Sequence, residues 1–142
     1  MIDLHTHTTA SDGTDSPAEL INKALAAGIK TLAITDHDST SGWSEAIAAL
    51  RTSMSLVLGA EISTLTNVGT SVHILGLLFD GEDRDLQAML LDSRDTRIPR
   101  MRKMIELLAA DGIAITMEDV IAATPPGATV GRPHLADALV KN

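Results

Sequence analysis

The alternation of short apolar segments with punctuated helical segments is the strongest constraint on the fold. The segment 31–35 is short, largely apolar and partly β-branched, which predicts a buried strand. Before it, Ser16 is placed to cap a helix, Pro17 suits the first helical position, Glu19 completes a capping box, and Gly28 follows the helix. Strands that alternate with helices predict βαβ units, so we expect an α/β fold with a mostly parallel sheet.

Further segments extend this pattern. We expect strands at 2–4, 55–63 and 72–79, a helix at 42–51 and a loop at 66–71. The near-continuous apolar character of the strands favours burial on both faces of the sheet.

The second half of the chain is expected to be helical. A long charged helix is predicted from 82 to 108, where Pro99 should kink or split it and Gly112 follows its end. Thr116 and Asp119 carry a second capping signal for a short helix. A loop at 125–133 and a last helix at 134–142 complete the chain.

Composition narrows the chemistry. The formal net charge of −8 argues against a broad nucleic-acid-binding surface. The absence of cysteine leaves His, Asp and Glu as the strong metal ligands, a set that suits manganese, zinc or iron. The chain has no apolar stretch long enough to span a bilayer and no signal-peptide pattern, so we expect a cytoplasmic protein.

Histidines and carboxylates cluster where the predicted strands end. His5 and His7 share one side of a strand, because side chains alternate with period two, and two such imidazoles form half of a metal site. Asp36, His37 and Glu61 also lie at or after predicted strand ends, where α/β folds place their chemistry. The sequence therefore predicts metal binding.

Individual residues of this cluster have alternative interpretations. Asp12 either binds a metal or only forms the turn in "SDG". His37 is the expected direct ligand in "TDHD", with Asp36 orienting a neighbouring imidazole, whereas Asp38 could equally cap the next helix. His73 starts its apolar strand, so it is either a ligand or a hydrogen-bonded core histidine.

Glu61 follows an apolar run, where a carboxylate needs a partner to be buried. A carboxylate that bridges two metal ions explains this position best. The basic residues between 94 and 103 are typical of a solvated helix face. Arg132 and His134 in "GRPH" differ, because the Gly and Pro fix the direction of a guanidinium that can bind phosphate in bidentate fashion.

Together these residues resemble the PHP family of bacterial polymerase domains and histidinol phosphatases. The likeness rests on six motifs in family order, "DLHTHT", "SDG", "AITDHDS", "GAEIS", "VHILG" and "GRPHLADALV". It points to the branch that hydrolyses nucleoside 3′,5′-bisphosphates and trims short RNA from the 5′ end. The resemblance implies the N-terminal part of a distorted (β/α)7 barrel, residues 1–95, and the start of a small helical insertion domain, residues 96–142.

The resemblance also implies a ligand set and a cofactor. Two or three divalent metal ions, commonly manganese, with zinc or iron as alternatives, would be bound by His5 with His7, Asp12 with His37, and Glu61 with His73. Glu61 would also bridge. Arg97, Arg132 and His134 are the implied contacts for the phosphate that is not cleaved.

The family pattern includes further metal ligands late in the chain, and a β/α barrel normally takes about 200 residues or more. We therefore expect an N-terminal portion of a longer enzyme. The expected substrate is a small phosphorylated nucleotide or short oligonucleotide, hydrolysed by a metal-bound water without a protein nucleophile. Histidinol phosphatase activity and a catalytically silent PHP module are the alternatives; the sequence does not indicate an oligomeric state.

Overall fold

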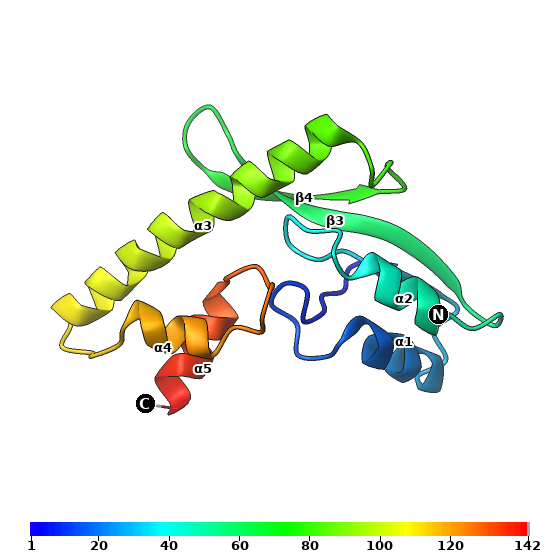
Figure 1. Ribbon diagram of the computed structural model, residues 1–142, viewed down its shortest axis with the longest axis horizontal. Helices are drawn as coiled ribbons and strands as arrows, with labels where there is room; N and C mark the ends of the chain where they lie inside the picture. The colour runs from blue at the N-terminus through cyan, green and yellow to red at the C-terminus, as the bar shows by residue number, and fades with distance from the viewer. Residues whose placement is uncertain (142) are drawn as a thin grey trace.

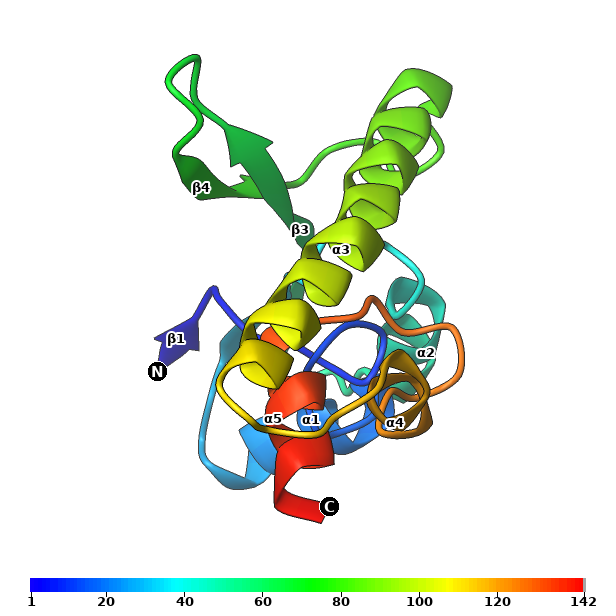
Figure 2. The ribbon, with the colours of Figure 1, turned by 90° about the vertical axis from the view of Figure 1, so that its left-hand side faces the viewer.

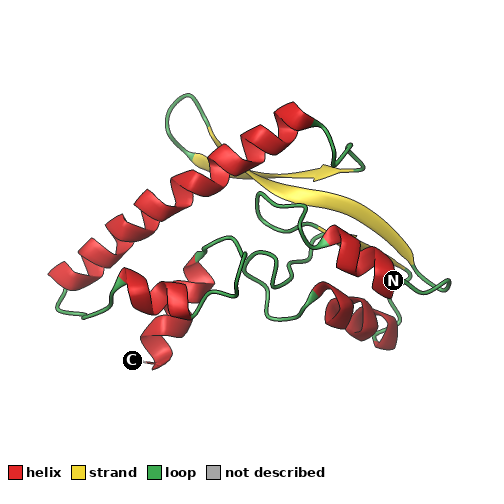
Figure 3. Cartoon of the chain, in the orientation of Figure 1, coloured by secondary structure: helices red, strands yellow, loops and turns green. Residues whose placement is uncertain are grey.

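The computed structural model describes residues 1–141 and contains four strands and five helices there (Figure 1, Figure 3). In chain order these are β1 (Ile2–Asp3), α1 (Pro17–Ala26), β2 (Thr31–Ile34), α2 (Trp43–Ala49), β3 (Ser55–Leu65), β4 (Ser71–Leu77), α3 (Arg84–Ala110), α4 (Met117–Ala122) and α5 (Arg132–Lys141). Each expected element is present. The predicted last helix extends to Asn142, which lies outside the described residues.

The strands form one curled sheet in the order β1-β2-β3-β4. β1, β2 and β3 are parallel, with Ile34 opposite Leu58, whereas β4 is antiparallel to β3. The reversal follows from the short link between Leu65 and Ser71, because a parallel crossover needs a dozen or more residues. The predicted α/β class with a mostly parallel sheet is confirmed, as a half-barrel. Figure 2 shows the β3–β4 hairpin projecting beside α3.

The expectation that the strands are buried on both faces holds for β2 and is wrong for β4. Leu32 and Ile34 are buried, whereas Val72 and Ile74 are exposed. β4 lies at the edge of the four-stranded sheet and is exposed over its first five residues. Its apolar sequence therefore does not correspond to a buried position within the described chain.

The capping predictions are confirmed. Both Ser16 and Thr116 accept a hydrogen bond from the backbone N–H three residues later, and both capping boxes are complete. Pro99 does not split α3, which continues from Arg84 to Ala110 at the cost of one backbone donor; a kink at Pro99 stays a prediction. The expected start of the last helix is wrong. α5 begins at Arg132, inside the predicted loop, because Pro133 fits a first helical turn.

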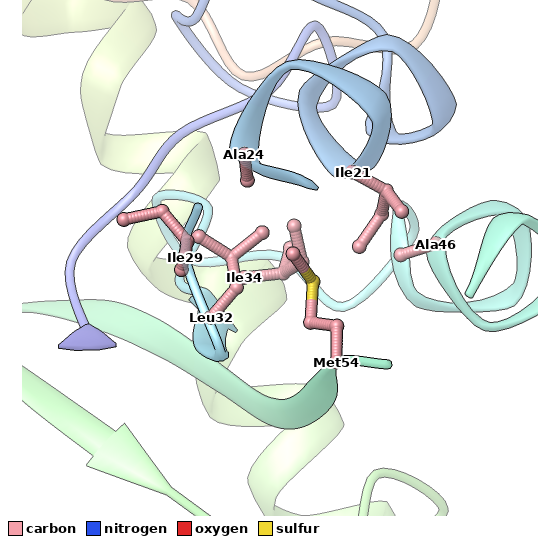
Figure 4. Close-up of a cluster of buried hydrophobic side chains, with 7 residues drawn as sticks. All are labelled: Ile21, Ala24, Ile29, Leu32, Ile34, Ala46 and Met54. Atoms are coloured by element: carbon pink, nitrogen blue, oxygen red, sulfur yellow. The ribbon is translucent and has the colours of Figure 1, made fainter. Parts of the chain in front are cut away.

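Two separate clusters of buried apolar side chains support the fold. The first lies between α1, α2 and β2, and Figure 4 shows its side chains, which include Ile21, Leu32 and Ile34, pointing toward one another. The second joins the later part of α3 to α4 and α5, and contains Val120 and Leu135. α3 leads from the sheet to the second cluster (Figure 1). It also runs through the predicted boundary between residues 95 and 96, and that division stays a prediction.

Candidate metal centre

The loop after β1 brings two histidines to the carboxyl end of β2. The Thr35 backbone N–H donates to the Thr6 carbonyl at 2.9 Å, and the Thr6 N–H donates to the Thr35 hydroxyl at 3.1 Å. This pairing extends the β1–β2 contact beyond the strands and fixes Thr6 between His5 and His7. At Gly13 a Cβ atom would lie 2.4 Å from the His7 carbonyl oxygen, so the returning loop requires glycine there.

Asp36 anchors the loop that carries His5 and His7. Its buried carboxylate accepts hydrogen bonds from the Thr8 N–H at 2.7 Å, the Thr8 hydroxyl at 2.8 Å and the Ser11 hydroxyl at 2.6 Å. The Ser11 oxygen in turn lies 3.4 Å from His7 Nδ1. Asp36 therefore acts on the His7 imidazole through Ser11 rather than by direct contact.

Glu61 is the centre of the cluster. It lies inside β3, past the point where pairing with β2 ends, and forms an isolated parallel bridge with His37. One carboxylate oxygen is 2.6 Å from His5 Nε2 and 2.9 Å from His7 Nε2, and the other is 2.6 Å from His73 Nδ1. The buried carboxylate thus has the partners that its apolar surroundings require.

The antiparallel direction of β4 explains the position of His73. Because β4 runs back along β3, its first residues lie beside the last residues of β3, and His73 is opposite Ser63. A residue at the start of this strand therefore reaches the same end of the sheet as Glu61. The His73 side chain is 32% exposed, so it is not a core histidine.

Asp12 and His37 complete the cluster. Asp12 lies 3.4 Å from His7 Nδ1 and 3.6 Å from His37 Nε2. Donor atoms within 4.8 Å of one another form three groups: His5, His7 and Glu61; His7, Asp12 and His37; and His37, Glu61 and His73. Each pair of residues that the family resemblance implied falls within one of these groups.

The surroundings change the pKa values of two members. Burial and the Arg97 charge together lower the pKa of His37 to about 4, against the raising effects of Asp12 and Glu61. For Glu61, burial raises the pKa, but the hydrogen bond from His5, the charge that His37 carries at low pH and the hydrogen bond from His73 outweigh it, so that the pKa is about 2. His37 is therefore neutral and Glu61 ionised at neutral pH, the states that bind metals.

The cluster fits a divalent metal. His37 Nδ1 is buried and has no hydrogen-bond partner within residues 1–141, which is unfavourable unless another group binds it. The donor set of imidazoles and carboxylates suits manganese, zinc or iron. The residues present thus match the predicted cofactor in chemistry, and they do not distinguish among these ions.

A cleft opens beside the cluster. Asp12, His37 and His73 line it on one side. The rest of the lining comes from α3, from the loop before α5 and from the start of α5: Arg97, Arg100, Met101, Met104, Val130, Gly131, Arg132 and Pro133. Two of the predicted phosphate contacts, Arg97 and Arg132, thus line one cleft with the metal-ligand candidates.

His134, the third predicted phosphate contact, is buried, and its Nδ1 accepts a hydrogen bond from the Gly131 N–H at 3.0 Å. Burial lowers its pKa, although Asp12 and Asp137 act in the opposite direction. The contact holds the turn that places Arg132 at the cleft.

Sequence reasoning missed the role of Asp38. It does not cap α2, which begins at Trp43 after Gly42. Its carboxylate is instead bonded to Ser63 and Arg97. The sequence predicts that Arg100 lies with its neighbours on a solvated helix face, yet it lines the cleft. Its spacing of three from Arg97 on one helix indicates that the two side chains lie on the same face.

The half-barrel sheet, with imidazoles and carboxylates gathered at the carboxyl ends of its parallel strands, defines the class of protein. A sequence profile of the PHP domain matches residues 3–96, and the chain belongs to this family. It is related to the nucleoside bisphosphate phosphatases and exoribonucleases within it.

Particular relatives are similar over nearly the whole chain. A 5′-3′ exoribonuclease of Haemophilus influenzae and a 3′,5′-nucleoside bisphosphate phosphatase of Chromobacterium violaceum are each 39% identical over 140 residues, covering 98% of this chain and 50% and 49% of theirs. The crystal structure of a proposed metal-dependent phosphoesterase from Bifidobacterium adolescentis superimposes with a TM-score of 0.88 and 40% identity, over 99% of this chain and 49% of that one. The chain spans about half the length of the relatives it matches.

No helix in the described part of the chain combines the length and the apolar character that crossing a membrane requires.

Proposed function

We propose that this chain carries the catalytic centre of a metal-dependent phosphoesterase that removes the 3′-phosphate of nucleoside 3′,5′-bisphosphates and also acts on short RNA from its 5′ end. One observation carries the proposal: Asp12, His37 and His73, three of the metal-ligand candidates, line the same cleft as Arg97 and Arg132. The names of the two relatives with 39% identity support this substrate class.

The proposed ligand set consists of three pairs: His5 with His7, Asp12 with His37, and Glu61 with His73, for two or three divalent ions of which manganese is our first choice. When bound, such ions polarise the phosphoryl oxygens and lower the pKa of a bound water, so that no protein nucleophile is needed.

The residues of the chain itself bind and orient the substrate. The arginine guanidinium groups at 97 and 132 are planar donors that match the oxygens of a phosphate, and they lie in the same cleft as Arg100. They would bind the phosphate that is retained and direct the other phosphate toward Glu61 and its histidines. Met104 adds apolar surface against which a nucleobase can lie.

The direct test measures phosphate release from adenosine 3′,5′-bisphosphate with added manganese, with EDTA as the metal-free control. We expect metal-dependent release that His7→Ala abolishes while circular dichroism shows an intact fold. Full activity of His7→Ala would refute the site assignment.

The same assay separates the alternatives. Faster release from histidinol phosphate would favour a histidinol phosphatase. Failure to bind manganese or zinc at stoichiometric levels would favour a catalytically silent module.

A further inference from the structure

We propose that Asp38 and Ser63 are positioning residues that hold the Arg97 guanidinium in its place at the cleft. This inference rests on the proposed function, because it takes Arg97 to be a phosphate contact. It concerns a buried polar network that links the turn after β2, strand β3 and helix α3.

Each of the three side chains in this network contacts the other two. The Asp38 carboxylate accepts hydrogen bonds from the Ser63 N–H at 2.7 Å and the Ser63 hydroxyl at 2.8 Å. It also accepts a hydrogen bond from Arg97 Nε at 2.9 Å. Arg97 Nη2 lies 2.8 Å from the same carboxylate as an ion pair and donates to the Ser63 oxygen at 2.6 Å. Three segments distant in sequence are thereby joined by charged hydrogen bonds, the strongest kind available to side chains.

The backbone of Asp38 has an unusual conformation that suits this arrangement. Its φ of 50° lies in the left-handed region, which costs energy for residues other than glycine and is best tolerated by Asn and Asp. The two aspartates beside His37 therefore have different anchors: Asp36 binds the loop at Thr8, and Asp38 binds Arg97. The conformation aims the Asp38 carboxylate at α3.

The orientation of Arg97 follows from these bonds. A guanidinium has five N–H donors in one plane, and the hydrogen bonds that Arg97 makes within residues 1–141 use Nε and Nη2. The Nη1 edge is left for a ligand, and Arg97 lines the cleft. Because the Asp38 side chain is fully buried, its carboxylate has no bulk water as a substitute partner, whereas the Arg97 side chain is 14% exposed. The network therefore fixes the direction of the donor edge before any ligand arrives.

The test measures binding of inorganic phosphate to the chain by calorimetry in EDTA, so that no metal is involved. Ser63→Ala removes one hydroxyl from the network, whereas Ser63→Thr keeps it on a residue suited to a strand. We expect Ser63→Ala to weaken phosphate binding several-fold and Ser63→Thr to restore it. Asp38→Asn keeps a residue that tolerates positive φ and should weaken binding about tenfold, as expected for the loss of a charged hydrogen bond.

A matched control is Asp83→Asn. Asp83 caps the same helix α3 by accepting a bond from the Leu86 N–H at 2.8 Å, so it affects stability but is not in the network. We expect its phosphate affinity to stay within about twofold of the unmodified chain. The double variant Asp38→Asn/Arg97→Ala should bind no more weakly than Arg97→Ala alone, because the effect of Asp38 passes through Arg97.

The outcomes separate the two proposals. If Arg97→Ala weakens phosphate binding but Asp38→Asn and Ser63→Ala do not, the positioning role is wrong and the proposed phosphate contact stands. If Arg97→Ala binds phosphate as well as the unmodified chain, Arg97 is not a phosphate contact and both inferences about it are overturned.

Discussion

Because the two apolar clusters are separate, we expect a cavity in one cluster to destabilise that cluster more than the other. Ile21 on α1 is fully buried in the first cluster, and Leu135 on α5 is 7% exposed in the second. Both are helical, so substitution by alanine creates a comparable cavity in each cluster without opposing the local secondary structure. The pair Ile21→Ala and Leu135→Ala is therefore a matched probe of cooperativity.

The expected cost follows from burial. Removing a buried Ile or Leu side chain to Cβ costs about 2–5 kcal/mol, and the better helix propensity of alanine returns at most about 0.4 kcal/mol. We expect about 3 kcal/mol for Ile21→Ala and about 2 kcal/mol for Leu135→Ala, whose site is slightly more open. Val140→Ala, at a position 87% exposed, should change stability by less than about 0.5 kcal/mol.

The single tryptophan allows the clusters to be observed separately. Trp43 packs against the first cluster, donates from Nε1 to the Gly59 carbonyl at 3.0 Å and lies 5.2 Å from the Phe79 ring. Its fluorescence reports on that cluster, whereas far-UV circular dichroism also reports on α3, α4 and α5. In urea, Ile21→Ala should shift the fluorescence midpoint, and Leu135→Ala should shift mainly the circular dichroism transition.

A single result refutes this reasoning. If Leu135→Ala lowers the fluorescence midpoint as much as Ile21→Ala does, with both probes coincident, the two clusters unfold as one cooperative unit. The polar contacts between them would then couple the clusters as strongly as apolar packing couples the residues within each.

Three further predictions concern the local structure around the site. Gly13→Ala should destabilise the chain by about 1–3 kcal/mol in urea and weaken zinc binding in calorimetry, because its Cβ would meet the His7 carbonyl; unchanged zinc affinity would contradict this. Ser16→Ala should cost about 1 kcal/mol in urea through loss of the cap on α1, and no change in midpoint would count against the capping box. Hydrogen bonds from the Ser16 backbone and side chain lower the Glu19 pKa below 4.5. The ionised carboxylate therefore stabilises the folded chain above pH 4.5, and this stabilisation is lost as the pH falls. A Glu19→Gln chain should lack that part of the acid dependence of the urea midpoint.

Local signals predicted the helices and much of the site. The capping residues Ser16 and Thr116 act over three residues, so their function is visible in a short segment of sequence. Glu61 was identified because a carboxylate in an apolar strand needs partners, and the structure supplies His5 and His73. His5, His7, Asp36 and His37 were predicted from their positions at strand ends, because parallel strands share one functional edge.

Long-range features were not predictable in the same way. The contact between Asp38 and Arg97 joins residues 59 positions apart, and nothing near either residue indicates the other. The direction of β4 could have been inferred from its short connection, and that would have placed His73 correctly. The continuity of α3 through Pro99 reflects the balance between one lost hydrogen bond and the many that remain, which a local rule cannot weigh.

The three donor groups of the metal centre form a closed ring of shared ligands. His7 belongs to the first and second groups, His37 to the second and third, and Glu61 to the first and third. Cations bound there would therefore not be independent: filling one position would fix a ligand of each neighbour and place a positive charge beside it. The consequence is thermodynamic linkage, so that a metal titration would not follow the isotherm of independent sites and any single substitution at His7, His37 or Glu61 would weaken two positions at once.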